Sequence, residues 1–120
     1  MTANETAHYA AQYALDKKGE DVVIMDVRGL SNATDFFVIA SASSDVQINA
    51  IATNVEKMLR KDYKIHINHK EGSGSSSWVL LDYIDVLVHV FHKEKRGFYG
   101  LEELWADAKF ETVTDNADEH

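Results

Sequence analysis

The chain has 120 residues, 45% of them hydrophobic, and no cysteine. This length predicts one domain with one core, and the lack of cysteine excludes a disulfide scaffold, a thiolate metal site and a cysteine nucleophile. Twenty Asp and Glu against 12 Lys and Arg give a formal net charge of −8, which favours a basic protein partner and predicts little direct contact with nucleic acid. No segment approaches the roughly 20 apolar residues of a membrane span, and the N-terminus lacks the features of a secretory signal, so we expect a cytoplasmic protein.

The first half of the chain predicts two helices separated by two strands. Alanine-rich helical spacing indicates the first helix, and β-branched and aromatic runs indicate strands whose short connection makes them hairpin neighbours. Ser44 and Gln47 form a capping-box pattern before an apolar face at three-and-four spacing. The predicted elements are a helix over residues 5–17, strands over 21–27 and 35–41, and a helix from 43 to about 61.

The second half predicts three strands and a last helix. Ile65 and Ile67 alternate with polar residues, as in a half-exposed strand. The predicted elements are a strand over residues 64–70, a flexible Gly/Ser loop over 71–77, strands over 78–82 and 86–91 around a tight turn, and a helix over 96–105. The order α-β-β-α-β-β-β-α predicts an α/β (α+β) fold with a mixed five-stranded sheet and flanking helices. We expect a single domain over residues 1–106 and a disordered acidic tail over 107–120.

Two carboxylates in the second half raise the question of metal-dependent nucleotidyl transfer. Gly72-Ser73 precedes a strand that carries Asp82, and Asp85 follows. Nucleotidyltransferases typically place two carboxylates two positions apart, with one residue between them, so that both lie on one strand face and share metal ions. Here the two residues are three apart, which favours two aspartates that cap a turn. A divergent metal-dependent nucleotidyltransferase that uses Asp82 and Asp85 stays open as the alternative.

The remaining chemical motifs are weak. His66, His69, His89 and His92 form two pairs spaced by three, which on a strand places the imidazoles on opposite faces and argues against a metal site. The Gly/Ser loop lacks the lysine and the following helix of a phosphate-binding loop. No Gly-x-Ser-x-Gly sequence marks a serine nucleophile. We therefore expect no metal, no cofactor and no catalytic residue.

A surface for a protein partner is the stronger interpretation. Large aromatic groups next to carboxylates suit a basic partner, since rings fill pockets and carboxylates pair with Arg or Lys. Trp105 fits a core position by its helical spacing, whereas Trp78, at a strand start beside the loop, suits a core role and a contact role equally. The residues concerned are Trp78, Tyr83, Tyr99 and Trp105, with Glu71, Asp82, Asp85, Glu102 and Glu103.

The chain from about residue 8 to 106 resembles the ribosomal silencing factor family, also called RsfS or iojap-like. No single matching segment is specific, but together they are. The segments are Lys17–Val23, Asp26–Ser31, Thr34–Ala40, Trp78–Tyr83, Asp85-Val86, Val88–Phe91 and Leu101–Trp105. Ile84 departs from the family pattern, because the family usually has glycine at this turn position, and so does the serine-rich loop 74–77, where relatives often carry charge.

The resemblance implies a fold related to nucleotidyltransferases without their catalytic carboxylates. It implies a factor that docks on a protein of the large ribosomal subunit at the subunit-joining face, blocks the small subunit sterically and lowers translation when nutrients are short. It also implies a homodimer when the chain is free; a dimeric scaffold with no ribosomal role is a third interpretation. The contact residues it suggests are Trp78, Leu80, Asp82, Tyr83 and Asp85, with Glu71 and Gly72.

Overall fold

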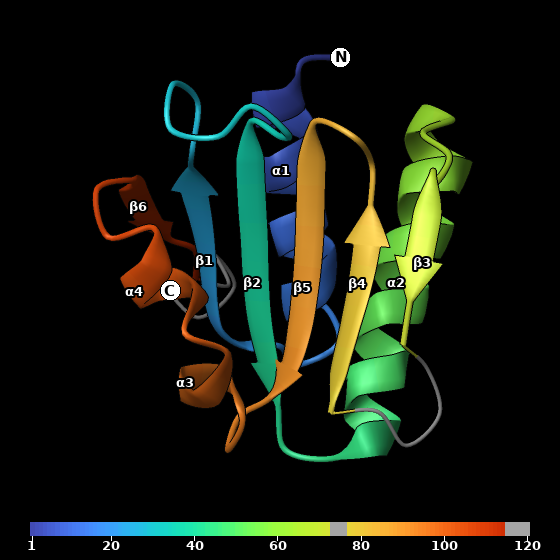
Figure 1. The fold of residues 1–120 in the computed structure, drawn as a ribbon. Helices are drawn as coiled ribbons and strands as arrows, with labels where there is room; N and C mark the ends of the chain where they lie inside the picture. Colours follow the sequence, from blue (N-terminus) through green and yellow to red (C-terminus); the bar gives the residue numbers. More distant parts are fainter. Residues whose placement is uncertain (73–76, 115–120) are drawn as a thin grey trace.

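A six-stranded mixed sheet organises the chain, with strands in the order β3-β4-β5-β2-β1-β6. The computed structural model describes residues 1–72 and 77–114. The helices there are α1 (Ala3–Leu15), α2 (Asp45–Tyr63), α3 (Arg96–Tyr99) and α4 (Leu101–Leu104). The strands are β1 (Glu20–Asp26), β2 (Phe36–Ala42), β3 (His69–Glu71), β4 (Trp78–Asp82), β5 (Val86–His92) and β6 (Lys109–Thr112). Figure 1 shows the sheet with α1 and α2 behind it.

The two central strands, β2 and β5, pair in parallel, and every other pairing is antiparallel. The predicted α+β class with a mixed sheet and flanking helices is confirmed, and so are the two predicted hairpins, β1–β2 and β4–β5. The number of strands differs, because the sheet has six strands and not five.

The additional strand lies in the segment that we predicted to be a disordered tail. β6 pairs with β1, and His8 Nε2 lies 3.0 Å from a carboxylate oxygen of Glu111. All four β6 residues are exposed, so no hydrophobic pattern marks the strand, and backbone hydrogen bonds to the edge of β1 hold it. The prediction of disorder is wrong for residues 109–112. Residues 115–120, like loop residues 73–76, lie outside the described part of the chain.

Two predicted elements are longer than the structure has them. The strand predicted over residues 64–70 is reduced to β3; Ile65 and Ile67 are partly buried against the core without strand pairing. Their alternation therefore reflects burial and not pairing. The helix predicted over residues 96–105 is interrupted at Gly100, whose φ of 63° ends α3 and begins α4. Leu104 is consequently 73% exposed.

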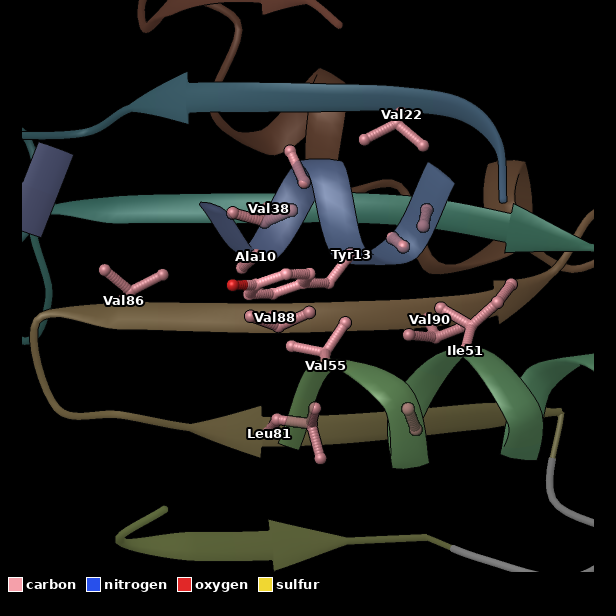
Figure 2. Close-up of a cluster of buried hydrophobic side chains, with 14 of the residues drawn as sticks. Ala10, Tyr13, Val22, Val38, Ile51, Val55, Leu81, Val86, Val88 and Val90 are labelled. Carbon is pink, nitrogen blue, oxygen red and sulfur yellow. The ribbon is translucent and has the colours of Figure 1, made fainter. Parts of the chain in front are cut away.

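Helices α1 and α2 cover one face of the sheet and enclose the larger core. Thr2 and Glu5 form a full capping box at the start of α1, and Ser44 caps α2. Figure 2 shows Ile51 and Val55 of α2 pointing toward β5, with Tyr13 of α1 beside them. The Tyr13 hydroxyl donates to Asp62 of α2 at 2.9 Å, which ties the two helices together. No helix in the described ranges is long and apolar enough to cross a membrane.

The C-terminal segment covers part of the other face. Trp105 packs edge-on against Phe37, with 5.6 Å between ring centroids, so it occupies the core position predicted for it. Arg96 holds this segment in place. Its Nη1 donates to the Asp21 carbonyl (2.6 Å) and to Ser41 Oγ (2.9 Å), and its Nε donates to Glu102 (2.9 Å). This cover lies over β1 and β2, and it completes a second, smaller core cluster.

A stack of three rings extends that cluster toward β4. The rings of Trp78, His89 and Phe91 lie side by side, with 5.8–6.4 Å between each pair of ring centroids and ring planes within 17° of parallel. The Trp78 Nε1–H donates to His89 Nδ1 at 3.1 Å, and this bond places the proton of the neutral imidazole on Nε2. His89 is only 6% exposed, and burial lowers its pKa from 6.5 to about 4. His89 is therefore a neutral core residue.

The β4–β5 turn contains a residue in a conformation that disfavours its side chain. Ile84 has a φ of 73°, in the left-handed region that β-branched residues rarely adopt. Asp82 Oδ1 accepts the Ile84 N–H at 2.7 Å, and the Tyr83 N–H donates to the Val86 carbonyl. These bonds hold the turn closed in spite of the unfavourable backbone.

Ile84→Gly should raise the free energy of unfolding by about 1 kcal/mol, because glycine removes the left-handed penalty and Ile84, which is 59% exposed, has little burial to lose. Urea denaturation measures the effect. Ile84→Ala is the control, since alanine keeps a Cβ at positive φ. Equal stability of the two variants would contradict the explanation.

His89→Leu should flatten the dependence of stability on pH. Because the folded-state pKa of His89 is about 4, below its ordinary value of 6.5, only the unfolded chain binds a proton between these values. The wild type should therefore keep, above pH 6.5, all the stability that the buried neutral His89 contributes. Its free energy of unfolding should fall by up to about 1.4 kcal/mol for each pH unit as the pH falls toward 4. Denaturation at several pH values measures both slopes. Identical slopes would show that His89 does not titrate in this way.

Candidate functional site

The C-terminal cover stops short of β4 and β3, which leaves one side of the sheet open. Figure 1 shows no helix of the described ranges in front of these strands. Alternation along each strand identifies the side chains on this side. We call this surface the open sheet face; its residues are His69 and Glu71 of β3, Trp78, Leu80 and Asp82 of β4, and Leu87 of β5.

Strand register places these residues in two rows across the sheet. In one row Glu71 lies opposite Leu80, which lies opposite the buried His89. In the other row His69 lies opposite Asp82, which lies opposite Leu87. Cross-strand neighbours have Cβ atoms about 5 Å apart, so the rows form one continuous surface.

Exposure increases from the middle of the sheet toward its edge. His89 is buried, Leu80 and Leu87 are half-buried, and Glu71 is exposed. The surface therefore combines accessible apolar groups near β5 with polar groups near the edge. A partner would bury the leucines and Trp78 at the centre and meet charge at the rim, which is the usual arrangement of a protein interface.

The charged groups of the open sheet face are arranged in different ways. Glu71 accepts a bond from His69 Nε2 at 3.1 Å, with both side chains more than half exposed. Asp82 uses one oxygen to cap the turn. Within residues 1–72 and 77–114 its other oxygen takes part in no hydrogen bond or ion pair, so Asp82 can face a cation while it holds the turn.

Four of the seven predicted contact residues come together on this face: Glu71, Trp78, Leu80 and Asp82. Tyr83 does not. It points to the helix side, is 9% exposed and belongs to the larger core, and burial raises the pKa of its hydroxyl. Asp85 is exposed at the turn.

Gly72 has a structural role beside this face. Its φ is 81°, and a Cβ at this position would lie 2.2 Å from the Trp78 carbonyl oxygen. The glycine therefore allows the chain to approach the start of β4 closely. Any side chain here would clash with the backbone at the start of β4.

The sequence interpretation did not include Leu87 and His69. Leu87 reads as one more apolar residue in a buried strand, and only the extent of the C-terminal cover reveals that it is half-buried. His69 belongs to the face because β3 pairs with β4 in a register that places it opposite Asp82. His69 lies two residues before Glu71, so alternation along one strand could have placed both on the same side. We predicted a strand over residues 64–70 and a loop from residue 71, and this boundary separated the two residues.

The residues proposed for catalysis or metal binding are not arranged as a site. Asp82 caps the turn, as expected from its spacing, and Asp85 lies beyond it. His89 is in the ring stack, while His92 Nδ1 accepts the Glu94 N–H. In residues 1–72 and 77–114 no group of three or more His, Cys, Asp or Glu side chains could hold a metal ion.

Comparison with known proteins identifies relatives along the whole chain. A sequence model of the family described as "Ribosomal silencing factor during starvation" matches residues 1–120. Ribosomal silencing factor RsfS of Halalkalibacterium halodurans is 42% identical over 108 residues, which cover 90% of this chain and 92% of the relative. The Bacillus subtilis factor is 41% identical, with coverage of 90% and 91%. The chloroplastic Iojap protein of Zea mays is 38% identical over 82% of this chain and 42% of its own.

Solved structures agree with this assignment. A Chromobacterium violaceum protein superposes with a TM-score of 0.84 at 31% identity, over 98% of this chain and 97% of that one. A Bacillus halodurans protein gives a TM-score of 0.79 at 38% identity, with coverage of 92% and 99%. Sequence and fold therefore lead to one conclusion: this chain belongs to the ribosomal silencing factor family, RsfS.

Proposed function

We propose that this chain silences translation in the cytoplasm by binding a basic protein of the large ribosomal subunit through the open sheet face. The bound chain then prevents the small subunit from joining, and it does so under nutrient limitation. The observation that carries the proposal is the uncovered, half-apolar and acid-bordered sheet at β3, β4 and β5. Membership of a family of ribosome-associated silencing factors supports the ribosome as the target.

The chemistry of the open sheet face suits a basic protein surface. Leu80, Leu87 and the outer side of Trp78 offer apolar contact, and the ring stack holds the tryptophan in one orientation before binding. Glu71 and Asp82 lie beside them. Carboxylates at the rim speed association with a cationic partner and fix its register.

A steric mechanism needs only size and position. The chain measures 36 × 35 × 33 Å, and a face of a domain this size can supply the roughly 800 Å² per partner of a standard interface. A body of these dimensions at a subunit interface keeps the two surfaces apart. No bond is made or broken in this mechanism, and we propose that the chain is not an enzyme.

The double variant Glu71→Gln/Asp82→Asn should weaken binding to purified large subunits by about 1–2 kcal/mol at low salt, because it removes both carboxylate charges of the face. Asparagine still supplies an oxygen for the turn. Co-sedimentation measures the affinity, and the difference from wild type should shrink as salt screens the charges.

The control for this pair is Asp16→Asn/Glu20→Gln, which removes the same amount of charge at exposed positions outside the open sheet face. This variant should bind like wild type. Equal weakening of both double variants would mean that net charge, and not the face, governs binding.

The enzymatic alternative makes a different prediction. If the chain has no nucleotide site, magnesium with nucleoside triphosphates should leave its melting temperature unchanged, since only a ligand of the native state raises it. A thermal-shift series measures this. A rise that disappears in Asp82→Asn would favour the metal-dependent nucleotidyltransferase instead.

A further inference from the structure

The outward side of α2 gathers positive charge in an acidic chain. Residues 57, 60, 61 and 64 follow the three-and-four spacing of one helix face, and all four are exposed. They lie opposite the buried side of the helix, which holds Ile51, Val55 and Leu59. We call this surface the α2 cation patch; it consists of Lys57, Arg60, Lys61 and the C-cap residue Lys64.

The carboxylates of α2 lie at the border of this patch or beyond it, although Glu56 is only one turn before Arg60. Glu56 lies 3.4 Å from Lys70 Nζ beside β3, and Asp62 accepts the Tyr13 hydroxyl toward α1. Asp45 is in the first turn, at the other end of the helix. None of the ion pairs in the described ranges involves a patch residue. The patch itself holds four cationic side chains and no carboxylate, although the whole chain carries −8.

A shallow hollow of ≈ 400 Å³ continues the patch toward the end of α1. Lys57 and Lys17 both line it, together with Asn49, Thr53 and Asn54 and without any carboxylate. Cations thus extend from Lys17 along α2 to Lys64. Residues 57 to 64 alone cover about 10 Å of helix axis.

Cations in the last turn of a helix also stabilise its dipole. This explanation covers Arg60, Lys61 and Lys64. It does not extend to Lys57, which lies about two turns before the end, or to Lys17, which follows α1 but borders the same hollow. A binding role accounts for all of them.

We propose that the α2 cation patch binds the phosphate backbone of RNA. Backbone phosphates form a row of negative charges, and lysines neutralise them without selecting bases. At physiological salt, charges more than about 8 Å apart are largely screened, so the local patch, and not the net charge, decides contact with a polyanion. RNA is the polyanion that a member of a ribosome-associated family meets. Since α2 lies behind the sheet (Figure 1), the patch and the open sheet face can bind at the same time.

The test uses the full chain and a labelled RNA duplex of about 20 base pairs, with affinity measured by fluorescence anisotropy from about 50 mM to about 200 mM salt. We expect binding at low salt, with a log–log slope of about −3.6, because four neutralised phosphates contribute about −0.9 each. Lys57→Glu/Lys61→Glu should lower the affinity at least about tenfold. Lys57→Gln/Lys61→Gln, which keeps good helix formers, should lower it by a smaller factor.

The matched control is Lys93→Glu/Lys95→Glu, which makes the same change in net charge at exposed lysines near the opposite end of α2, where the Lys93 N–H donates to the Ala42 carbonyl. This variant should bind RNA like wild type. The proposal is overturned if the wild type fails to bind RNA at low salt, or if the control variant weakens binding as much as Lys57→Glu/Lys61→Glu does. It is also overturned if a polyglutamate peptide with the same net charge as the RNA competes for the chain as well as unlabelled RNA. The last outcome would assign the patch to an acidic protein. None of these results depends on binding to the large subunit.

Discussion

The parallel pairing of β2 with β5 is the constraint on which the rest of the structure depends. It runs in unbroken register from Phe36↔Val86 to Ala42↔His92. Parallel neighbours require a long crossover, and here residues 43–85 supply it with α2, β3 and β4. The crossover lays α2 beside α1 on one face and extends the sheet beyond β5. The chain after β5 returns over β2 and β1, where Arg96 anchors it, so β4 and β3 stay uncovered.

The fold was predictable from sequence where periodicity and burial agree. The apolar face of α2 and the β-branched runs of β1, β2 and β5 bury what their patterns predict. Prediction failed where the periodicity of apolar residues did not correspond to the secondary structure. Ile65 and Ile67 alternate because they pack on the core, β6 pairs with β1 without a buried side chain of its own, and Gly100 divides a segment that reads as one helix. Which strands pair, and which glycine adopts a left-handed conformation, depend on tertiary structure and cannot be derived from local sequence patterns.

The candidate site was predictable in part for the same reason. Alternation places Trp78, Leu80 and Asp82 on one side of a strand, but only the returning C-terminal segment decides which side stays open. Tyr83, the next residue, falls on the buried side. Trp78 packs and hydrogen-bonds against His89, as a core role requires, and its half-buried position on the open sheet face is the basis of the contact role that we propose for it. The carboxylates of the open sheet face and the α2 cation patch lie on opposite sides of the sheet.

The central claim is that a chain bound to the large subunit keeps the small subunit away. Light scattering of purified subunits tests it most directly, with the chain added either before or after the subunits meet. The account predicts that prior incubation with large subunits slows and reduces joining, whereas addition to joined ribosomes has much less effect, because the contact surface is then covered. Joining at an unchanged rate in the presence of saturating chain would contradict it.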